Sequence, residues 1–224
     1  MAMGRSFLNR KFANDRYMKL TPFIILLNLA FLIIYFVCSS PRFANSLSLA
    51  RLHDWMIFQP KQILSGKYMW TVFTYPFVTM DVLSLLFDSI FLMFFGNRFE
   101  MEIGSKEFLF LYFSSSFFAA IVLLALTAIT GANLLAYGPG ASIFALIFAF
   151  SMLHRYESIM FLFAFRIKLP MFMLILLLLN TLYLYLGIGN SGEIILNFLG
   201  FFYALLYVSL RIRIGADQFF RNLF

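Results

Sequence analysis

Ser142 is the first residue whose type and setting suggest chemistry. It follows a Gly-Pro-Gly segment and opens an apolar run in the stretch AYGPGASIFAL, residues 136–146. A serine hydroxyl can act as a nucleophile in acyl transfer, provided that a neighbouring base takes its proton. A small residue at the start of an apolar helix can also serve only to let two helices approach closely. The choice between these two roles depends on whether a base lies nearby.

A stripe of polar residues marks a second apolar run, DVLSLLFDSIF. Asp81, Ser84 and Asp88 are spaced i, i+3 and i+7, which places them on one face of a helix. Two acids suggest an aspartyl protease, but seven helical residues separate these two by about 10 Å, too far to share a proton. The stripe is consistent with a capping Asp81 and a buried, hydrogen-bonded Asp88, or with the wall of a water-filled cavity.

Asparagines are the other strongly polar residues within apolar runs. In lipid, amides usually form hydrogen bonds between helices, and this is the role expected for Asn28 and Asn180. Asn197 differs because Gly200 and Ala204 follow it and form a small-x-x-x-small face. Such a face lets another helix approach closely, so both residues are predicted to be helix-packing positions, as is Gly140, two residues before Ser142.

Metal, cofactor and nucleic-acid sites have no support in the composition. The single cysteine, Cys38, cannot form an internal disulfide, and the two histidines, His53 and His154, lie in different connecting segments. The net charge of +7 arises from basic residues between the apolar runs, which form no binding face. We expect no metal, no cofactor and no nucleic-acid partner.

The elements that must position these residues are membrane-spanning helices. The chain is 62% hydrophobic and only 12% charged, about half of the usual charged share of about 25%. It is therefore predicted to be an all-α, polytopic membrane protein in a lipid bilayer. The six predicted spans are residues 21–38, 80–95, 107–130, 141–153, 169–187 and 193–210. The fourth is short for a bilayer of about 30 Å, which suggests that other helices surround it.

The basic residues also predict the orientation and the domain limits. All but four of the 17 Lys and Arg residues fall on one side if both termini are cytosolic. We therefore predict a basic cytosolic N-terminus over 1–20, a transmembrane domain over 21–210 and a cytosolic tail over 211–224. The aromatic-rich outer loop, 39–79, is predicted to lie in the membrane interface. The segment 157–169 is a further candidate for a short interfacial element.

Four motifs, in order along nearly the whole chain, resemble those of the rhomboid superfamily of six-span intramembrane proteases and their inactive relatives. The stretch FGNRFEMEIGS resembles the pattern [FL]-G-x-x-x-E-x-x-x-G-S of the second span and its exit, with Gly96, Glu100 and Gly104 in place. The stretch MWTVFT resembles W-R-x-x-[ST] of the first outer loop, beginning at Trp70. GASI, from Gly140, resembles the nucleophile motif G-x-S-G, and NFLGFFYA resembles H-x-x-G-x-x-x-G of the sixth span.

The departures from these motifs concern the catalytic groups. The resemblance assigns Ser142 to the nucleophile and Asn197 to the base, where active rhomboids have histidine, and an amide cannot take a proton. His154 cannot replace it, being about 18 Å from Ser142 along the same helix. The oxyanion-binding positions are Ser84 and Asp88, and an ionised Asp88 would repel an oxyanion. Thr71 replaces the arginine of the loop motif, and Ile143 replaces the glycine after the nucleophile.

The resemblance therefore implies a pseudoprotease that binds transmembrane client proteins for quality control, trafficking or regulation. Inactive rhomboids are similar in holding clients at a lateral opening between the second and fifth spans. Ser142 then becomes a packing residue, with a hydrogen bond to Asn197 as a natural companion. A bacterial inner membrane is favoured by the compact core, and a eukaryotic endomembrane remains open.

Two alternatives stay open at this point. The first is a rhomboid serine endopeptidase in which Ser142 works with a non-standard base. The second is a transporter or lipid-handling protein, against which the chain lacks repeats and paired broken helices. The tail, RIRIGADQFFRNLF, is predicted to be an interfacial anchor, a docking peptide or a simple stop-transfer segment.

Overall fold

The computed structural model describes residues 20–39, 55–132, 134–154, 156–161, 165–187 and 189–212 of the chain. The predicted basic segment before residue 20, the first part of the outer loop with His53, and nearly all of the predicted tail lie outside the described residues. The predicted domain limits at both ends therefore stay predictions.

Helices account for most of the described chain, as the hydrophobic runs predict. The long helices and their continuations are α2 (Leu20–Ser39), α7 (Val82–Phe91), η2 (Leu92–Gly96), α8 (Asn97–Ile103), α9 (Ser105–Thr130), α10 (Gly140–Leu153), α11 (Leu169–Leu186), α12 (Ser191–Tyr207) and η3 (Val208–Ile212). Five helical segments are long and apolar enough to cross a membrane, and α10 is a shorter apolar helix. The chain is thus an all-α, polytopic membrane protein.

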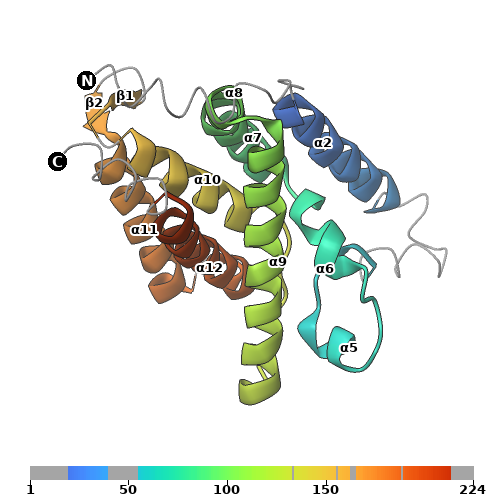
Figure 1. Ribbon diagram of the computed structural model, residues 1–224. Helices are drawn as coiled ribbons and strands as arrows, with labels where there is room; N and C mark the ends of the chain where they lie inside the picture. The colour runs from blue at the N-terminus through green and yellow to red at the C-terminus, as the bar shows by residue number, and fades with distance from the viewer. Residues whose placement is uncertain are drawn as a thin grey trace.

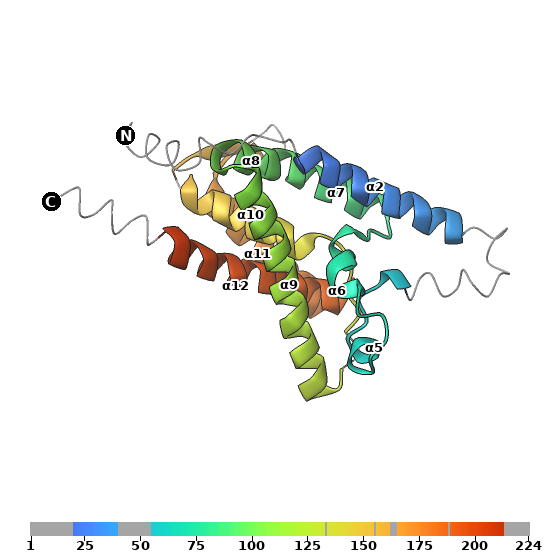
Figure 2. The ribbon, with the colours of Figure 1, turned by 45° about the vertical axis from the view of Figure 1, so that its right-hand side comes forward.

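The short helix α10 lies in the centre of the bundle. Ten of its 14 residues are buried, and it packs against α9, α11, α12 and η2. In Figure 1, α2 lies on one side of α9, while α11 and α12 lie on the other. Figure 2 shows α9 crossing the other helices and projecting beyond them at its Thr130 end. A helix too short to span the bilayer alone is thus surrounded by protein, as its length predicted.

Glycines on α12 bring that helix into direct contact with the backbone of other elements. A Cβ atom on Gly200 would overlap with the carbonyl oxygen of Ala141 in α10 and would lie 2.7 Å from Ala141 Cα. A Cβ atom on Gly192 would overlap with the carbonyl oxygen of Leu135, before α10. Ala204, also on α12, is completely buried. Only glycine permits this approach, so α12 holds α10 closely.

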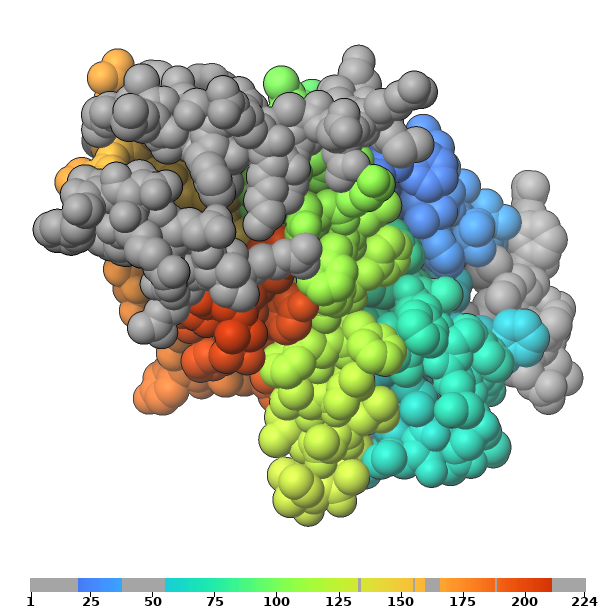
Figure 3. Space-filling view, in the orientation of Figure 1, coloured from blue at the N-terminus to red at the C-terminus, as the bar shows by residue number. Residues whose placement is uncertain are grey.

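The outer loop is attached to the bundle by buried aromatic residues. Its elements are α5 (Pro60–Leu64), α6 (Thr71–Thr74) and η1 (Tyr75–Phe77). Phe58 and Ala136 exchange two backbone hydrogen bonds of 2.9 and 3.0 Å, and the buried Tyr75 hydroxyl donates to the Ser116 carbonyl of α9 at 2.7 Å. In the space-filling view, the loop covers one flank of α9 (Figure 3). Trp70 stays half-exposed and donates from Nε1 to the Trp55 carbonyl at 3.1 Å.

The segment predicted as an interfacial element forms a β-hairpin. Strands β1 (Ser158–Phe161) and β2 (Phe165–Lys168) pair antiparallel, with Ser158 opposite Lys168 and Phe161 opposite Phe165. The hairpin connects α10 to α11. It is the one β-sheet among the described residues, and the Phe58–Ala136 pair is an isolated β-bridge.

Three motif residues hold the junction between α8 and α9. Gly104 has a φ of 101°, a conformation that side chains rarely adopt, and it lets the chain turn between the two helices. A Cβ atom on Gly96 would lie 3.3 Å from side-chain atoms of Phe108 and Thr21. Glu100 is completely buried and accepts hydrogen bonds from the start of α2 and from α9. These residues link α2, α8 and α9.

His154 and Glu102 form an ion pair at the end of α10. The distance from His154 Nε2 to Glu102 Oε2 is 3.0 Å. The hydrogen bond to Glu102 raises the pKa of His154 above its usual value. A raised pKa in the folded state means that the stabilisation is complete below the unfolded pKa of about 6.5 and is lost as the pH rises through the folded value.

We therefore expect wild type to be more thermostable than His154→Gln at a pH of about 5.5 and equally stable at a pH of about 9. The difference should stay below about 1 kcal/mol, because Glu102 is half-exposed and water screens the pair. Thermal unfolding in detergent at both pH values measures it. Glu102→Gln should remove the same pH-dependent part of the stability, because it removes the other partner of the ion pair. If wild type were more stable than His154→Gln by the same amount at both pH values, the stabilisation would not come from the His154–Glu102 ion pair.

Candidate functional site

Ser142 is completely buried against α9. Its hydroxyl donates to the Tyr112 carbonyl at 2.7 Å and also forms a hydrogen bond with the Ser116 hydroxyl. Both partners belong to α9, so the expected hydrogen bond with Asn197 is not formed. The prediction of that bond was wrong, because the side chain of Ser142 points to α9 and not to α12.

Position 140, and not position 142, faces Asn197. A Cβ atom on Gly140 would overlap with Asn197 Oδ1 and lie 3.1 Å from Asn197 Cγ. The Asn197 amide donates to Asn180 Oδ1 of α11 at 3.2 Å. Two residues along an α-helix turn through about 200°, so positions 140 and 142 point to nearly opposite sides of α10. The helix face that meets α12 therefore carries a glycine.

This geometry changes how the nucleophile motif fits the chain. If position 140 is the serine position, the pattern G-x-S-G falls on Gly138, Pro139, Gly140 and Ala141. Gly140 then takes the place of the nucleophile. The sequence analysis placed the serine of this motif on Ser142 because Ser142 is the only serine in residues 136–146. The two glycines of the Gly-Pro-Gly segment were the signal for the alternative register.

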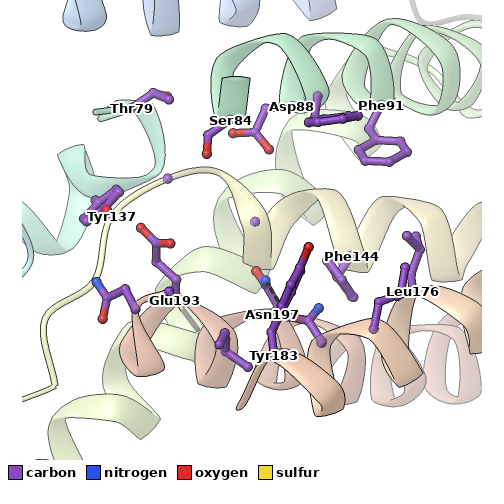
Figure 4. A pocket seen from close by; sticks show the side chains of 18 residues that line it. Thr79, Ser84, Asp88, Phe91, Tyr137, Phe144, Leu176, Tyr183, Glu193 and Asn197 are labelled. Atoms are coloured by element: carbon purple, nitrogen blue, oxygen red, sulfur yellow. Dashed lines mark hydrogen bonds between the residues drawn. The ribbon is translucent and has the colours of Figure 1, made fainter. Parts of the chain in front are cut away.

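A cavity of about 480 Å³, lined by both apolar and polar residues, lies next to Gly140 and Asn197. Its walls come from α7, α10, α11 and α12 and from the segments before α7, α10 and α12. Figure 4 shows Ser84 and Asp88 extending into it from α7, and Glu193 and Asn197 from α12. The three residues of the predicted polar stripe, Asp81, Ser84 and Asp88, therefore have two different roles. Asp81 is exposed and caps α7 by accepting from the Ser84 backbone N–H at 2.7 Å, while Ser84 and Asp88 face the cavity.

Sequence reasoning missed Glu193, which brings a second carboxylate to the cavity. Its Oε1 atom is buried and has no hydrogen-bond partner among the described residues. Tyr137, in the segment before α10, lines the same cavity. Burial of its hydroxyl and the neighbouring Glu193 carboxylate raise the pKa of Tyr137 to about 12. The spacing of Glu193 and Asn197, one helical turn apart, was the signal that could have identified it.

The titratable side chains that line the cavity are carboxyl groups and tyrosines. Asp88 and Glu193 lie on opposite walls, and the described lining residues include no Lys, Arg or His. Within the described part of the chain, no three His, Cys, Asp or Glu side chains come together as a metal site would require. The arrangement can accept hydrogen bonds and attract a cation. Between α10 and α12, Gly140 offers no hydroxyl and the Asn197 amide cannot act as a base.

Comparison with known proteins agrees with the motifs and the helical bundle. Among curated proteins, no sequence matches this chain. The family model described as the rhomboid domain matches residues 66–212, from the outer loop to the end of the last helix. This match spans well over half of the chain, and it includes α7 to α12 and the cavity between them. The chain therefore belongs to the rhomboid family.

Proposed function

We propose that this protein is a catalytically inactive rhomboid that binds transmembrane segments of client proteins. The observation that carries the proposal is the facing pair of Gly140 and Asn197. In active rhomboids a serine and a histidine meet between these two spans. Glycine offers no nucleophile, and an amide cannot take a proton. Acyl transfer needs both groups.

The environment of Ser142 supports the same conclusion. Its hydroxyl makes two hydrogen bonds to α9 and has no access to the cavity. To react, it would have to break both bonds and leave a buried site. The histidine His154 is paired with Glu102 and lies at the other end of α10. Neither residue can form a dyad with the other.

The charge of the cavity also opposes peptide hydrolysis. The tetrahedral intermediate of acyl transfer carries a negative oxygen, which active sites stabilise with hydrogen-bond donors. Here Asp88 and Glu193 bring two carboxylates to the same space. An ionised carboxylate only accepts hydrogen bonds and would repel the oxyanion. The site is chemically suited to binding.

What the protein retains is the bundle and a cavity between α7 and α11, the second and fifth spans. A cavity at this place can receive part of a membrane-embedded segment. This supports a role in the recognition of client proteins, for quality control, trafficking or regulation.

Labelling with a serine-reactive fluorophosphonate tests the loss of catalysis. We expect no labelling of the purified wild-type protein or of Ser142→Ala. The triple variant Gly140→Ser, Asn197→His and Asp88→Asn should gain labelling, because it supplies the nucleophile, the base and a neutral oxyanion site. An active rhomboid protease labelled in parallel controls for the probe. Labelling of wild type that disappears in Ser142→Ala would refute the proposal and restore Ser142 as the nucleophile.

A further inference from the structure

The two carboxylates of the cavity have no cationic partner within it. Asp88 comes from α7 and Glu193 from α12, so they approach the cavity from opposite walls (Figure 4). None of the described lining residues is Lys, Arg or His. The described lining of the cavity therefore contains no positively charged side chain.

A second, independent observation points to a missing hydrogen-bond partner. Thr79 lines the cavity and is only 1% exposed, and its hydroxyl has no hydrogen-bond partner among the described residues. The same holds for Glu193 Oε1. Buried polar atoms are normally hydrogen-bonded, and leaving them unpaired costs free energy. A bound group that donates several hydrogen bonds would satisfy both oxygens.

The rim of the cavity indicates where such a group comes from. Phe87 of α7 and Leu179 and Tyr183 of α11 line it and are about half-exposed on the apolar surface of the bundle. Elsewhere, α7 and α11 are joined through Phe172, whose ring centroid lies 6.3 Å from that of Phe91. An apolar rim around an acidic interior favours a ligand that arrives through lipid.

We propose that the cavity binds a lysine or arginine side chain carried by a membrane-embedded helix of a client protein. This inference rests on the proposed function and names the chemistry that the client must supply. The aliphatic stem would lie along the apolar rim, and the charged head would lie between Asp88 and Glu193. An ammonium group donates three hydrogen bonds and a guanidinium five, enough for both carboxylates and the Thr79 hydroxyl.

Photo-crosslinking in the membrane tests this inference. The full chain is reconstituted in phosphatidylcholine vesicles with a photo-reactive residue at Leu179, on the rim. The probes are single-span Leu-Ala helices with Lys, Leu or Glu at the central position. We expect the Lys helix to crosslink about tenfold more than the Leu helix, as one charge pair in a partly desolvated site predicts, and the Glu helix to crosslink least.

Matched variants connect the preference to the two carboxylates. The double variant Asp88→Asn and Glu193→Gln keeps the shape of the cavity and should abolish the preference for Lys. Asp81→Asn removes the same type of charge outside the cavity and still caps α7, so it should keep the preference. A photo-reactive residue at Leu178, which is 67% exposed and does not line the cavity, measures background crosslinking.

The outcomes separate this inference from the proposed function. Equal capture of the Lys and Leu helices at Leu179, above the Leu178 background, would overturn the charge preference and leave client binding intact. Crosslinking of every helix at the Leu178 background level would overturn both. A Lys preference that survives the double variant would also overturn the inference, since the carboxylates would then not be its source.

Discussion

Gly200→Ala should destabilise the protein by about 3 kcal/mol or more, at the upper end of what overpacking of a core costs. The added methyl group would overlap with the Ala141 carbonyl oxygen and lie 2.7 Å from both Ala141 C and Ala141 Cα. Backbone atoms cannot rotate away as the end of a side chain can. To make room, α12 would have to move away from α10, the central helix, and its buried contacts would loosen.

Thermal unfolding in detergent, followed by circular dichroism, measures this effect. Gly96→Ala is the matched control, because its new methyl group would meet only side-chain atoms of Phe108 and Thr21, at 3.3 Å and beyond. We expect that control to cost at most about 1 kcal/mol, since small shifts of side chains relieve the contact. If both variants lose the same stability, the close α10–α12 contact is not what holds the bundle together.

Glu100→Ala should be the second severe change, costing about 3 to 5 kcal/mol. The buried carboxylate accepts hydrogen bonds from Leu20 N at 2.7 Å, Thr21 N at 3.0 Å, Thr21 Oγ1 at 2.9 Å and Ser105 Oγ at 2.7 Å. The two backbone N–H groups belong to the first turn of α2, where a helix has no internal acceptors. Alanine would leave these donors unpaired in a buried site.

The Glu100 variants can be separated from a general loss of charge. Glu102 lies two residues away on α8 and is half-exposed, so Glu102→Ala should cost less than about 1 kcal/mol. Glu100→Gln keeps one acceptor oxygen and should fall between the two. Thermal unfolding ranks the three variants, and limited proteolysis before α2 shows whether this helix detaches first. A Glu100→Ala protein as stable as Glu102→Ala would refute the role of Glu100 in holding α2.

Helix α10 illustrates how far sequence reasoning reached. The hydrophobic run and the Gly-Pro-Gly segment before it predicted a short helix, and its length predicted a central position. Both follow from the thickness of the bilayer, which any spanning helix must match. The run does not say which side of the helix meets which neighbour, because α10 is apolar all around and buried on most sides.

The candidate site shows the same limit. Asp88 and Asn197 stood out because polar residues are costly within apolar runs, and both line the cavity. Glu193 was overlooked because it lies at the start of a span, where a charge is unremarkable. Its importance comes from Asp88, more than 100 positions earlier in the chain, and only the packing of α7 opposite α12 brings the two together.

The sequence by itself determined that this is an all-α, polytopic membrane protein with the motifs of the rhomboid family. Hydrophobic length and glycine spacing are local properties, and the membrane imposes them span by span. Only the tertiary structure decided that Gly140, and not Ser142, faces Asn197. Residues two positions apart on a helix point to opposite sides, and which side meets α12 depends on how the whole bundle packs.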